Sequence, residues 1–260
     1  IAVLGLTAVY EGEDGDAFLA DGGADRKNLS LPASHIAFLK ALRKKTKTPI
    51  VVVITAGSAV DIAAIEPYAD AIVLAWYPGQ QGGNALADII FGNVSPSGHL
   101  PVTFYKSFDD LPEYKSYAMQ GRTYRYFTGQ VLYPFGFGMS YTSFDYSWNK
   151  QPLVVKDSIS FSVKVKNKGQ YNADDVVQVY IHYPSMNGMP VKELKSFKRI
   201  SLQVNEEGLA VFSMPVAELK KWDEQKGQWN LYPGDYKIVV GENAADEKLA
   251  AVVHLTREHK

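Results

Sequence analysis

The feature that most constrains the fold of this 260-residue chain is a change of hydrophobic pattern partway along it. In the first part, short apolar runs alternate with helical patterns. The runs "PIVVVITA" (49–56) and "AIVLAWY" (71–77) are nearly continuous, as in strands that are covered on both faces. Residues 34–45 place His35 and the apolar side chains Phe38, Leu39 and Leu42 at i, i+3, i+4 and i+7, which is one face of a helix. This alternation predicts parallel strands joined by right-handed crossovers, so we expect α/β architecture.

Four further elements complete the prediction for the first part of the chain. Residues 1–6 have a strand-like pattern, and "VDIAAIEPY" (60–68) predicts a short helix. The stretch "PGQQGGNALADIIFG" (78–92) predicts a turn and a helix closed by glycine. We expect "GHLPVTFY" (98–105) to form a further, shorter strand.

The last part of the chain shows only β patterns. Apolar and polar residues mostly alternate, and turn signals such as Asn167-Lys168-Gly169 separate the runs. The predicted strands are 159–167, 175–183, 194–204, 209–216, 235–243 and 248–255. Short strands at this spacing predict a two-sheet sandwich of the immunoglobulin or fibronectin type. We therefore expect an α/β part at 1–118 and an all-β domain at 146–260.

Between them, residues 119–145 form an aromatic-rich inter-domain segment. It is rich in Tyr, Phe, Gly and Pro and has no clean period. A flexible linker would be polar or rich in Gly and Ser, whereas this segment holds too many aromatic side chains to remain in water. We predict an ordered segment packed across a domain junction. Its two arginines, Arg122 and Arg125, have the chemistry to clamp a carboxylate, but in a junction segment we expect them to have a structural role and to pair with neighbouring domains.

Composition excludes several classes of function. The formal net charge is −1 with no Lys/Arg block, so nothing indicates binding to nucleic acid or to an acidic membrane surface. No apolar segment approaches the roughly 20 residues of a membrane span. The chain has no cysteine, and its five histidines lie far apart, so we expect no metal site. The sequence opens abruptly on "IAVLGLT", from which we expect that an upstream part is missing and that localisation cannot be deduced here.

An acidic loop, "EGEDGD" (11–16), follows the first predicted strand directly. Loops at the carboxyl ends of parallel strands are where α/β proteins usually bind ligands. Taken alone, an acidic loop is more often a solvated surface than a catalytic one. The spacing does not match an EF-hand, which requires D-x-[DN]-x-[DN]-G and a glutamate at position twelve.

The order of several motifs favours a catalytic loop over a solvated surface loop. "EGE…GGADRKNLSLP", "AWYPGQQGGNALADIIFGNVSPSGHLPVTFY" and "GRTYRYF…LYPFGFGMSYTSF" precede the predicted sandwich. Together they resemble the C-terminal portion of glycoside hydrolase family 3, the β-glucosidase and β-xylosidase family, over essentially the entire chain. The resemblance implies the second half of that family's α/β sandwich, with the sheet incomplete, and then a fibronectin type III-like domain. It also implies that the family's N-terminal barrel is missing.

The resemblance implies a role for the acidic loop. A retaining glycosidase uses a nucleophile and a general acid/base about 5–5.5 Å apart. In this family the nucleophile is an aspartate of the barrel, and the acid/base is a glutamate on a loop of this kind. Matched to the family motif, Glu13 is the expected acid/base. Glu11 is the alternative, or it contacts sugar hydroxyls or raises the proton affinity of Glu13. The gap from Glu13 to Asp25 is longer than in the simplest members, which leaves this choice open.

The remaining expectations follow from the same resemblance. Asp25 and Arg26 are expected to form a structural ion pair, whereas Asp14 and Trp76 are candidates for substrate contact. The substrate would be an oligosaccharide or aryl β-glycoside, with β-glucoside first and β-xyloside as the alternative. No cofactor is implied. The expected partner is the barrel portion, as a separate chain or one that has been removed, and a homodimer is compatible with the sequence. A periplasmic or secreted location is typical of the family. The competing hypothesis is a non-catalytic carbohydrate-binding module.

Overall fold

The computed structural model describes residues 1–11, 16–20, 26–186 and 188–256, and the chain divides into two compact units. The first unit comprises Ile1–Asn93, Phe104–Glu113 and Gly129–Tyr133. The second comprises Val94–Thr103, Tyr114–Thr128 and Pro134–Lys260.

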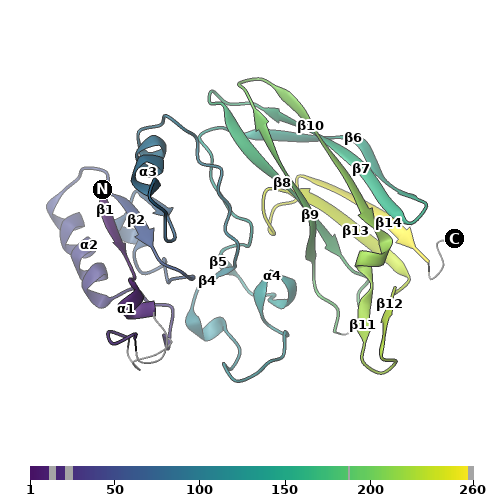
Figure 1. Cartoon of the computed structure of the whole chain (residues 1–260), viewed down its shortest axis with the longest axis horizontal. Coiled ribbons are helices and arrows are strands. Elements are labelled where there is room, and N and C mark those ends of the chain that lie inside the picture. Colours follow the sequence, from purple (N-terminus) through teal and green to yellow (C-terminus); the bar gives the residue numbers. More distant parts are fainter. Residues whose placement is uncertain (12–15, 21–25, 187, 257–260) are drawn as a thin grey trace. The chain divides into compact units, whose positions relative to one another are not determined.

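The first unit is built on a parallel sheet with the strand order β1-β2-β3. The strands are β1 (Ala2–Gly5), β2 (Val51–Thr55) and β3 (Ala71–Leu74). The central strand β2 is almost inaccessible to solvent at Val52, Val53 and Ile54, as a strand covered on both faces must be. Helix α2 (Ala33–Lys45) crosses from β1 to β2, lies beside the sheet (Figure 1) and buries Leu39 completely. The predicted α/β architecture is confirmed.

Short elements complete this unit. They are α1 (Ala8–Glu11), η1 (Glu66–Tyr68), α3 (Gly82–Ile90), β4 (Phe104–Tyr105), η2 (Phe108–Asp110) and β5 (Val131–Tyr133).

Two predicted elements of the first unit differ from the structure. The helix expected over 60–68 is only the 3₁₀ turn η1 at its end; Pro67 lies in this turn and has no N–H to donate to the carbonyl four residues before it, so an α-helical hydrogen bond cannot form there. The strand expected over 98–105 is reduced to β4, which pairs antiparallel with β5 in a sheet of two strands. Pro101 lies within the expected strand and has no N–H to donate to a neighbouring strand, so regular pairing begins only after it.

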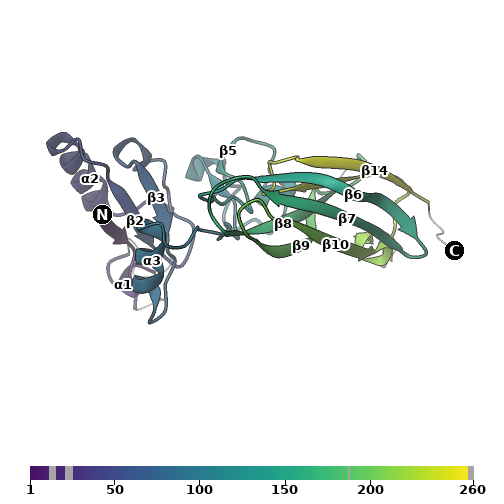
Figure 2. The same cartoon turned by 90° about the horizontal axis from the view of Figure 1, so that it is seen from above.

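The second unit is a sandwich of two antiparallel sheets, with strand orders β10-β7-β6 and β14-β13-β8-β9. The strands are β6 (Phe144–Val155), β7 (Ser158–Asn167), β8 (Ala173–His182), β9 (Glu193–Leu202), β10 (Glu207–Pro215), β13 (Gly234–Gly241) and β14 (Leu249–Leu255). Alternate residues of both sheets form one core, which includes Val163, Val179 and Ile238. Figures 1 and 2 show these strands running along the length of the unit. The predicted sandwich is confirmed.

The sequence patterns did not predict strand β6, which begins at the end of the aromatic-rich segment and continues beyond it. Its middle, "NKQP" (149–152), is polar, and its pairing with β7 shifts register between Trp148 and Lys150 and again before Leu153. These irregularities break the alternation on which strand prediction depends. Around the sandwich lie α4 (Thr123–Tyr126), η3 (Val216–Leu219) and a hairpin of β11 (Lys221–Asp223) and β12 (Gln228–Asn230).

The aromatic segment is ordered, and part of it packs against the sandwich. Tyr124 stacks on Phe135 with ring centroids 4.3 Å apart and meets Tyr180 of β8 edge-on at 5.9 Å. Gly136 lies at φ +79°, where a Cβ atom would stand 2.1 Å from the side-chain oxygen of the buried Gln178. Only glycine fits this close approach of loop and strand.

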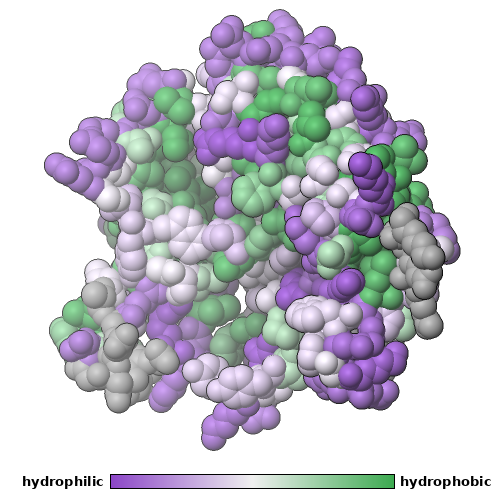
Figure 3. All heavy atoms as spheres, turned by 45° about the vertical axis from the view of Figure 1, so that its right-hand side comes forward, coloured by the Kyte–Doolittle hydropathy of each residue, from purple (hydrophilic) through white to green (hydrophobic). Residues whose placement is uncertain are grey.

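Figure 3 shows one face of the molecule, on which hydrophilic and hydrophobic residues are intermixed. In Figure 3 the side chains that project furthest are mostly hydrophilic, and hydrophobic residues gather in the recesses between them.

Candidate functional site

Residues that follow the carboxyl ends of the three parallel strands come together around one carboxylate, that of Glu11. Glu11 ends the short helix that follows β1, Gly57 and Ser58 follow β2, and Tyr77 follows β3. Because parallel strands end at the same edge of a sheet, these residues are brought together from positions far apart in sequence.

Both oxygens of the Glu11 carboxylate are occupied by donors. The Gly57 N–H donates to Oε2 at 2.7 Å, and the Tyr77 hydroxyl donates to the same oxygen. The Ser58 hydroxyl donates to Oε1 at 2.8 Å, and Arg26 Nη2 lies 3.3 Å from that oxygen. The Glu11 side chain is only 11% exposed. We call these five residues the Glu11 cradle.

The cradle holds Glu11 in its ionised form. Partial burial pushes the pKa of its carboxyl upward, but the hydrogen bonds from Tyr77, Gly57 and Ser58 and the charge of Arg26 outweigh burial and lower it. Burial and the neighbouring Glu11 carboxylate both disfavour loss of the Tyr77 proton, and they raise the pKa of Tyr77 to about 12.

This environment favours a structural role for Glu11 over proton transfer. A general acid must be protonated at the working pH, which requires a raised pKa. Glu11 has a lowered pKa, and each of its carboxylate oxygens already contacts two of the neighbours that the structure describes. It ties the start of the acidic loop to the ends of β2 and β3.

Backbone geometry supports the cradle. A Cβ atom at Gly57 would lie 2.9 Å from the Tyr77 ring and 3.3 Å from Glu11 Oε2, so a larger residue would push the donors away. Trp76, a candidate for substrate contact, is half-buried and has φ +55°, a left-handed conformation that is costly for a non-glycine residue. Such outliers gather at functional sites.

Three of the other predicted site residues cannot be placed, whereas Arg26 can. Glu13, Asp14 and Asp25 lie outside the described residues, so neither the expected acid/base nor the Asp25–Arg26 pair can be placed. Arg26 contacts Glu11 and also donates to the Ala59 carbonyl at 3.1 Å.

The two arginines of the aromatic segment make structural contacts. Arg122 donates to the backbone carbonyls of Ser116 at 2.9 Å and Ala118 at 3.2 Å. Arg125 forms an ion pair with Glu193, a buried carboxylate at the start of β9. Glu193 also accepts hydrogen bonds from three further side chains, Tyr183, Lys195 and Lys221, which stabilise its charged form.

Sequence inspection alone missed Gly57, Ser58 and Tyr77. A positional signal was present, since Gly57 and Ser58 directly follow the predicted run 49–56 and Tyr77 is the last residue of the predicted run 71–77, at the sheet edge where ligands usually bind. Their common target, however, depends on how the strands are ordered in space.

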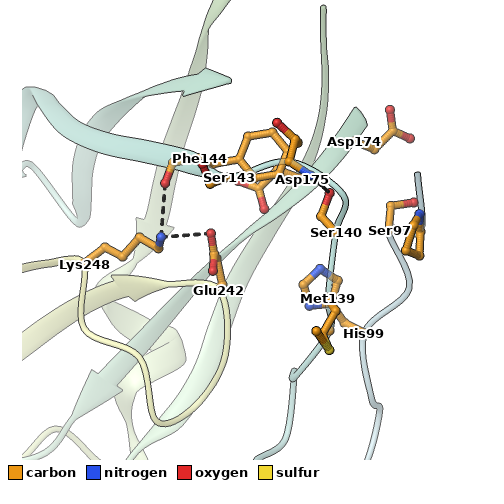
Figure 4. Close-up of a pocket in the computed structure, with 13 residues that line it drawn as sticks. Ser97, His99, Met139, Ser140, Ser143, Phe144, Asp174, Asp175, Glu242 and Lys248 are labelled. Carbon is orange, nitrogen blue, oxygen red and sulfur yellow. Dashed lines mark hydrogen bonds and ion pairs between the residues drawn. The ribbon is translucent and has the colours of Figure 1, made fainter. Parts of the chain in front are cut away.

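The second unit holds a separate small pocket of about 140 Å³ at one end of the sandwich (Figure 4). Acidic side chains line it, but Lys248 points in and forms an ion pair with Glu242 at 3.0 Å. Asp175 is 3% exposed and accepts a hydrogen bond from the Tyr146 hydroxyl at 2.6 Å. Burial outweighs this bond and raises the pKa of Asp175 to about 6.

The described residues hold neither a metal-binding cluster nor a membrane-spanning helix. No group of three or more His, Cys, Asp or Glu side chains among them is arranged to hold a metal ion. In that part of the chain no helix has the length and apolar composition needed to cross a bilayer.

Comparison with known proteins places these features in a family. The sequence matches the model of the glycosyl hydrolase family 3 C-terminal domain over residues 1–141 and that of a fibronectin type III-like domain over residues 175–244. It is 37% identical over 228 residues to a xylan 1,4-beta-xylosidase of Xylanibacter ruminicola, covering 87% of this chain and 26% of the relative. It is 34% identical over 246 residues to a periplasmic beta-glucosidase of Salmonella typhimurium, covering 88% and 32%.

Solved structures agree. A GH3 beta-glucosidase of Bifidobacterium adolescentis superposes with a TM-score of 0.84 at 32% identity, over 97% of this chain and 38% of that one. A beta-D-glucoside glucohydrolase of Trichoderma reesei gives 0.82 at 26% identity, over 98% and 39%. The chain spans about a quarter to a third of the length of the curated relatives named above. The ordered motifs, the two-part fold and these matches together establish that the chain belongs to glycosyl hydrolase family 3, as a C-terminal domain with a fibronectin type III-like domain after it.

Proposed function

We propose that this chain supplies the general acid/base of a retaining β-glycosidase, and that the residue is Glu13. The observation that carries the proposal is the Glu11 cradle. Of the two glutamates in the Glu-x-Glu pair, Glu11 is held as a carboxylate by four neighbours, so Glu13 is the one left for proton transfer. The names of the relatives, beta-glucosidases and a beta-xylosidase, support the reaction class.

In this proposal the reaction takes two steps. An aspartate of the barrel portion attacks the anomeric carbon, while Glu13 gives its proton to the departing glycosidic oxygen. Glu13, now a carboxylate, then removes a proton from the water that hydrolyses the glycosyl-enzyme. Glu11 is a positioning residue, because it fixes the loop two residues before Glu13 onto the strand ends. The chain by itself, without the nucleophile, is expected to be inactive.

The proposed substrate is a terminal β-D-glucosyl residue of an oligosaccharide or glycoside. The alternative is a β-xyloside, which the 37% identity to a xylan 1,4-beta-xylosidase supports. Comparing kcat/KM for aryl β-glucoside and aryl β-xyloside in the complete enzyme that contains this chain decides between them.

The acid/base assignment is tested by the dependence on the leaving group. We expect Glu13→Gln to lower kcat/KM by about 10²–10⁴ for an alkyl or oligosaccharide substrate, whose leaving oxygen needs a proton. With a dinitrophenyl glycoside, which leaves without protonation, glycosyl transfer to the nucleophile should be far less affected. Loss of the basic limb of the pH profile should accompany this change.

Glu11→Gln is the matched control. Because Glu11 acts through the placement of Glu13, its loss should lower kcat/KM mainly for substrates whose leaving oxygen needs a proton, by a smaller factor than Glu13→Gln, and should leave the pH limbs in place. If instead Glu11→Gln shows the strong leaving-group dependence and Glu13→Gln does not, the two roles are reversed and the proposal is wrong.

A further inference from the structure

The hairpin β11–β12 presents two tryptophans to solvent. Trp222 and Trp229 are direct cross-strand partners, and they remain 51% and 62% exposed. Their ring centroids are 5.8 Å apart and the ring planes meet at 68°, so one indole turns its edge toward the face of the other. The hairpin lies at one end of the sandwich (Figure 1). We call these two residues the indole pair.

The opposite face of the same hairpin is fixed to the second unit. Side chains alternate along a strand, so Lys221 and Asp223 point away from the indole pair. Lys221 forms an ion pair with the buried Glu193. Asp223 accepts from Asn230 Nδ2 at 2.9 Å and from the Lys226 N–H at 3.1 Å. The Lys221 ion pair thus ties the hairpin to β9, the Asp223 bonds brace the hairpin internally, and the indole pair lies on the opposite face.

The exposed area of the indole pair is small. A tryptophan buries about 150–250 Å² when fully covered, so two half-exposed ones offer about 150–250 Å² in total. A stable protein interface needs about 800 Å² on each partner. A second copy of this chain would therefore find too little surface here, whereas one or two pyranose rings would be well covered.

The charges around the pair favour a neutral ligand. Lys220 and Glu224 lie two residues to either side of Trp222, are both exposed and have opposite charges. The pair therefore combines apolar ring faces with nearby hydrogen-bonding groups and has no excess charge to attract an ionic partner. A pyranose sugar has complementary surfaces, since its axial C–H groups form an apolar face and its hydroxyls lie around the rim.

We propose that the indole pair is a binding platform for neutral β-1,4-linked glycan chains, separate from the site of hydrolysis. The choice of a glycan rests on the proposed glycosidase function. The platform would hold polymer near the enzyme without taking part in bond cleavage. It needs neither the barrel nor Glu13, so its binding can be measured on this 260-residue chain alone.

The experiment is calorimetric titration of the chain with cellohexaose and xylohexaose, together with co-sedimentation on insoluble xylan and cellulose. We expect a Kd on the order of 0.1–1 mM, as for a small exposed site. Trp229→Ala and Trp222→Ala should each weaken binding about tenfold or more. Trp229→Phe, which keeps an aromatic face, should recover part of the affinity. Phe197→Ala removes another exposed aromatic residue, 66% accessible on β9, and should leave binding unchanged.

Three outcomes overturn the platform. In the first, the wild-type chain binds neither hexasaccharide at 10 mM and neither polymer. In the second, both tryptophan variants bind glycan as the wild type does, even if their thermal stability falls, so that the pair serves only to stabilise the hairpin. Self-association that Trp229→Ala abolishes would also refute it in favour of a dimer contact. None of these results bears on the leaving-group test of Glu13, which measures hydrolysis.

Discussion

Replacing Asp175 with Asn should stabilise the second unit at neutral pH. Asp175 is buried at the end of the sandwich, close to the Glu242–Lys248 ion pair, and its nearest hydrogen-bond partner is the Tyr146 hydroxyl. Burial penalises the charged form and, with the nearby charge of Glu242, outweighs the favourable bond from Tyr146. The folded protein therefore binds the proton of Asp175 more tightly than the unfolded chain does.

The size of the effect follows from the pKa. A rise from the ordinary value of 3.8 to about 6 corresponds to about 3 kcal/mol. Because the folded-state pKa is raised, this contribution to stability is present below pH 3.8 and is lost as the pH rises through about 6. Asn keeps the acceptor for Tyr146 but has no charge. Asp175→Asn should thus be more stable than wild type by up to about 3 kcal/mol at pH 7.5, with little difference at pH 4.

Urea unfolding at a series of pH values measures this directly. Intrinsic fluorescence of the four tryptophans follows unfolding, and one of them, Trp148, packs against the sandwich core. A carboxyl ¹³C NMR titration gives the pKa of Asp175 independently. Asp174→Asn is the matched control: hydrogen bonds from Ser201 and Arg199 hold the pKa of Asp174 below its usual value, so its loss should destabilise at neutral pH.

The result that would refute this reasoning is a variant no more stable than wild type at pH 7.5. In that case Lys248 would be neutralising Asp175 effectively, and the pocket would hold a compensated ion pair. A gain in stability that is the same at pH 4 and pH 7.5 would also count against it, because burial of a charge must fade when the charge is protonated.

Two further substitutions test the framework of the second unit. Burial pushes the pKa of Glu193 upward, but hydrogen bonds from Lys221, Tyr183 and Lys195 outweigh burial and lower the pKa from 4.5 to about 2. The folded protein should therefore lose about 3 kcal/mol of stability as the pH falls from 4.5 to 2. Glu193→Gln should show a much smaller loss over that window in urea unfolding, and equal pH slopes would contradict the assignment. Gly136→Ala should cost about 2–4 kcal/mol, because it combines φ +79° with a Cβ clash at 2.1 Å. Gly188→Ala, at φ +80° with open space around it, should cost only about 1 kcal/mol in the same thermal melts, and equal costs would remove the clash from the explanation.

Hydrophobic periodicity by itself determined the architecture. The continuous run around β2 and the helical spacing of α2 predicted a parallel α/β sheet, and the alternating runs after β6 predicted a sandwich. These are local signals, because burial on two faces, on one face or on a helical stripe each leaves its own period in the sequence. Ordered motifs added the family. Both kinds of information are readable along the chain without knowing which elements touch.

Where a residue's partners are remote in sequence, only the tertiary structure decided its role. The donors to Glu11 stand 46, 47 and 66 residues away, at the ends of two other strands. Asp175 meets Tyr146 across 29 residues, and β4 pairs with β5 rather than with the parallel sheet. A glutamate in an acidic loop has the same local sequence whether it is solvated, catalytic or an anchor. What distinguishes these states is the set of donors and the burial around the carboxylate, which strand order and packing create and which local sequence does not encode.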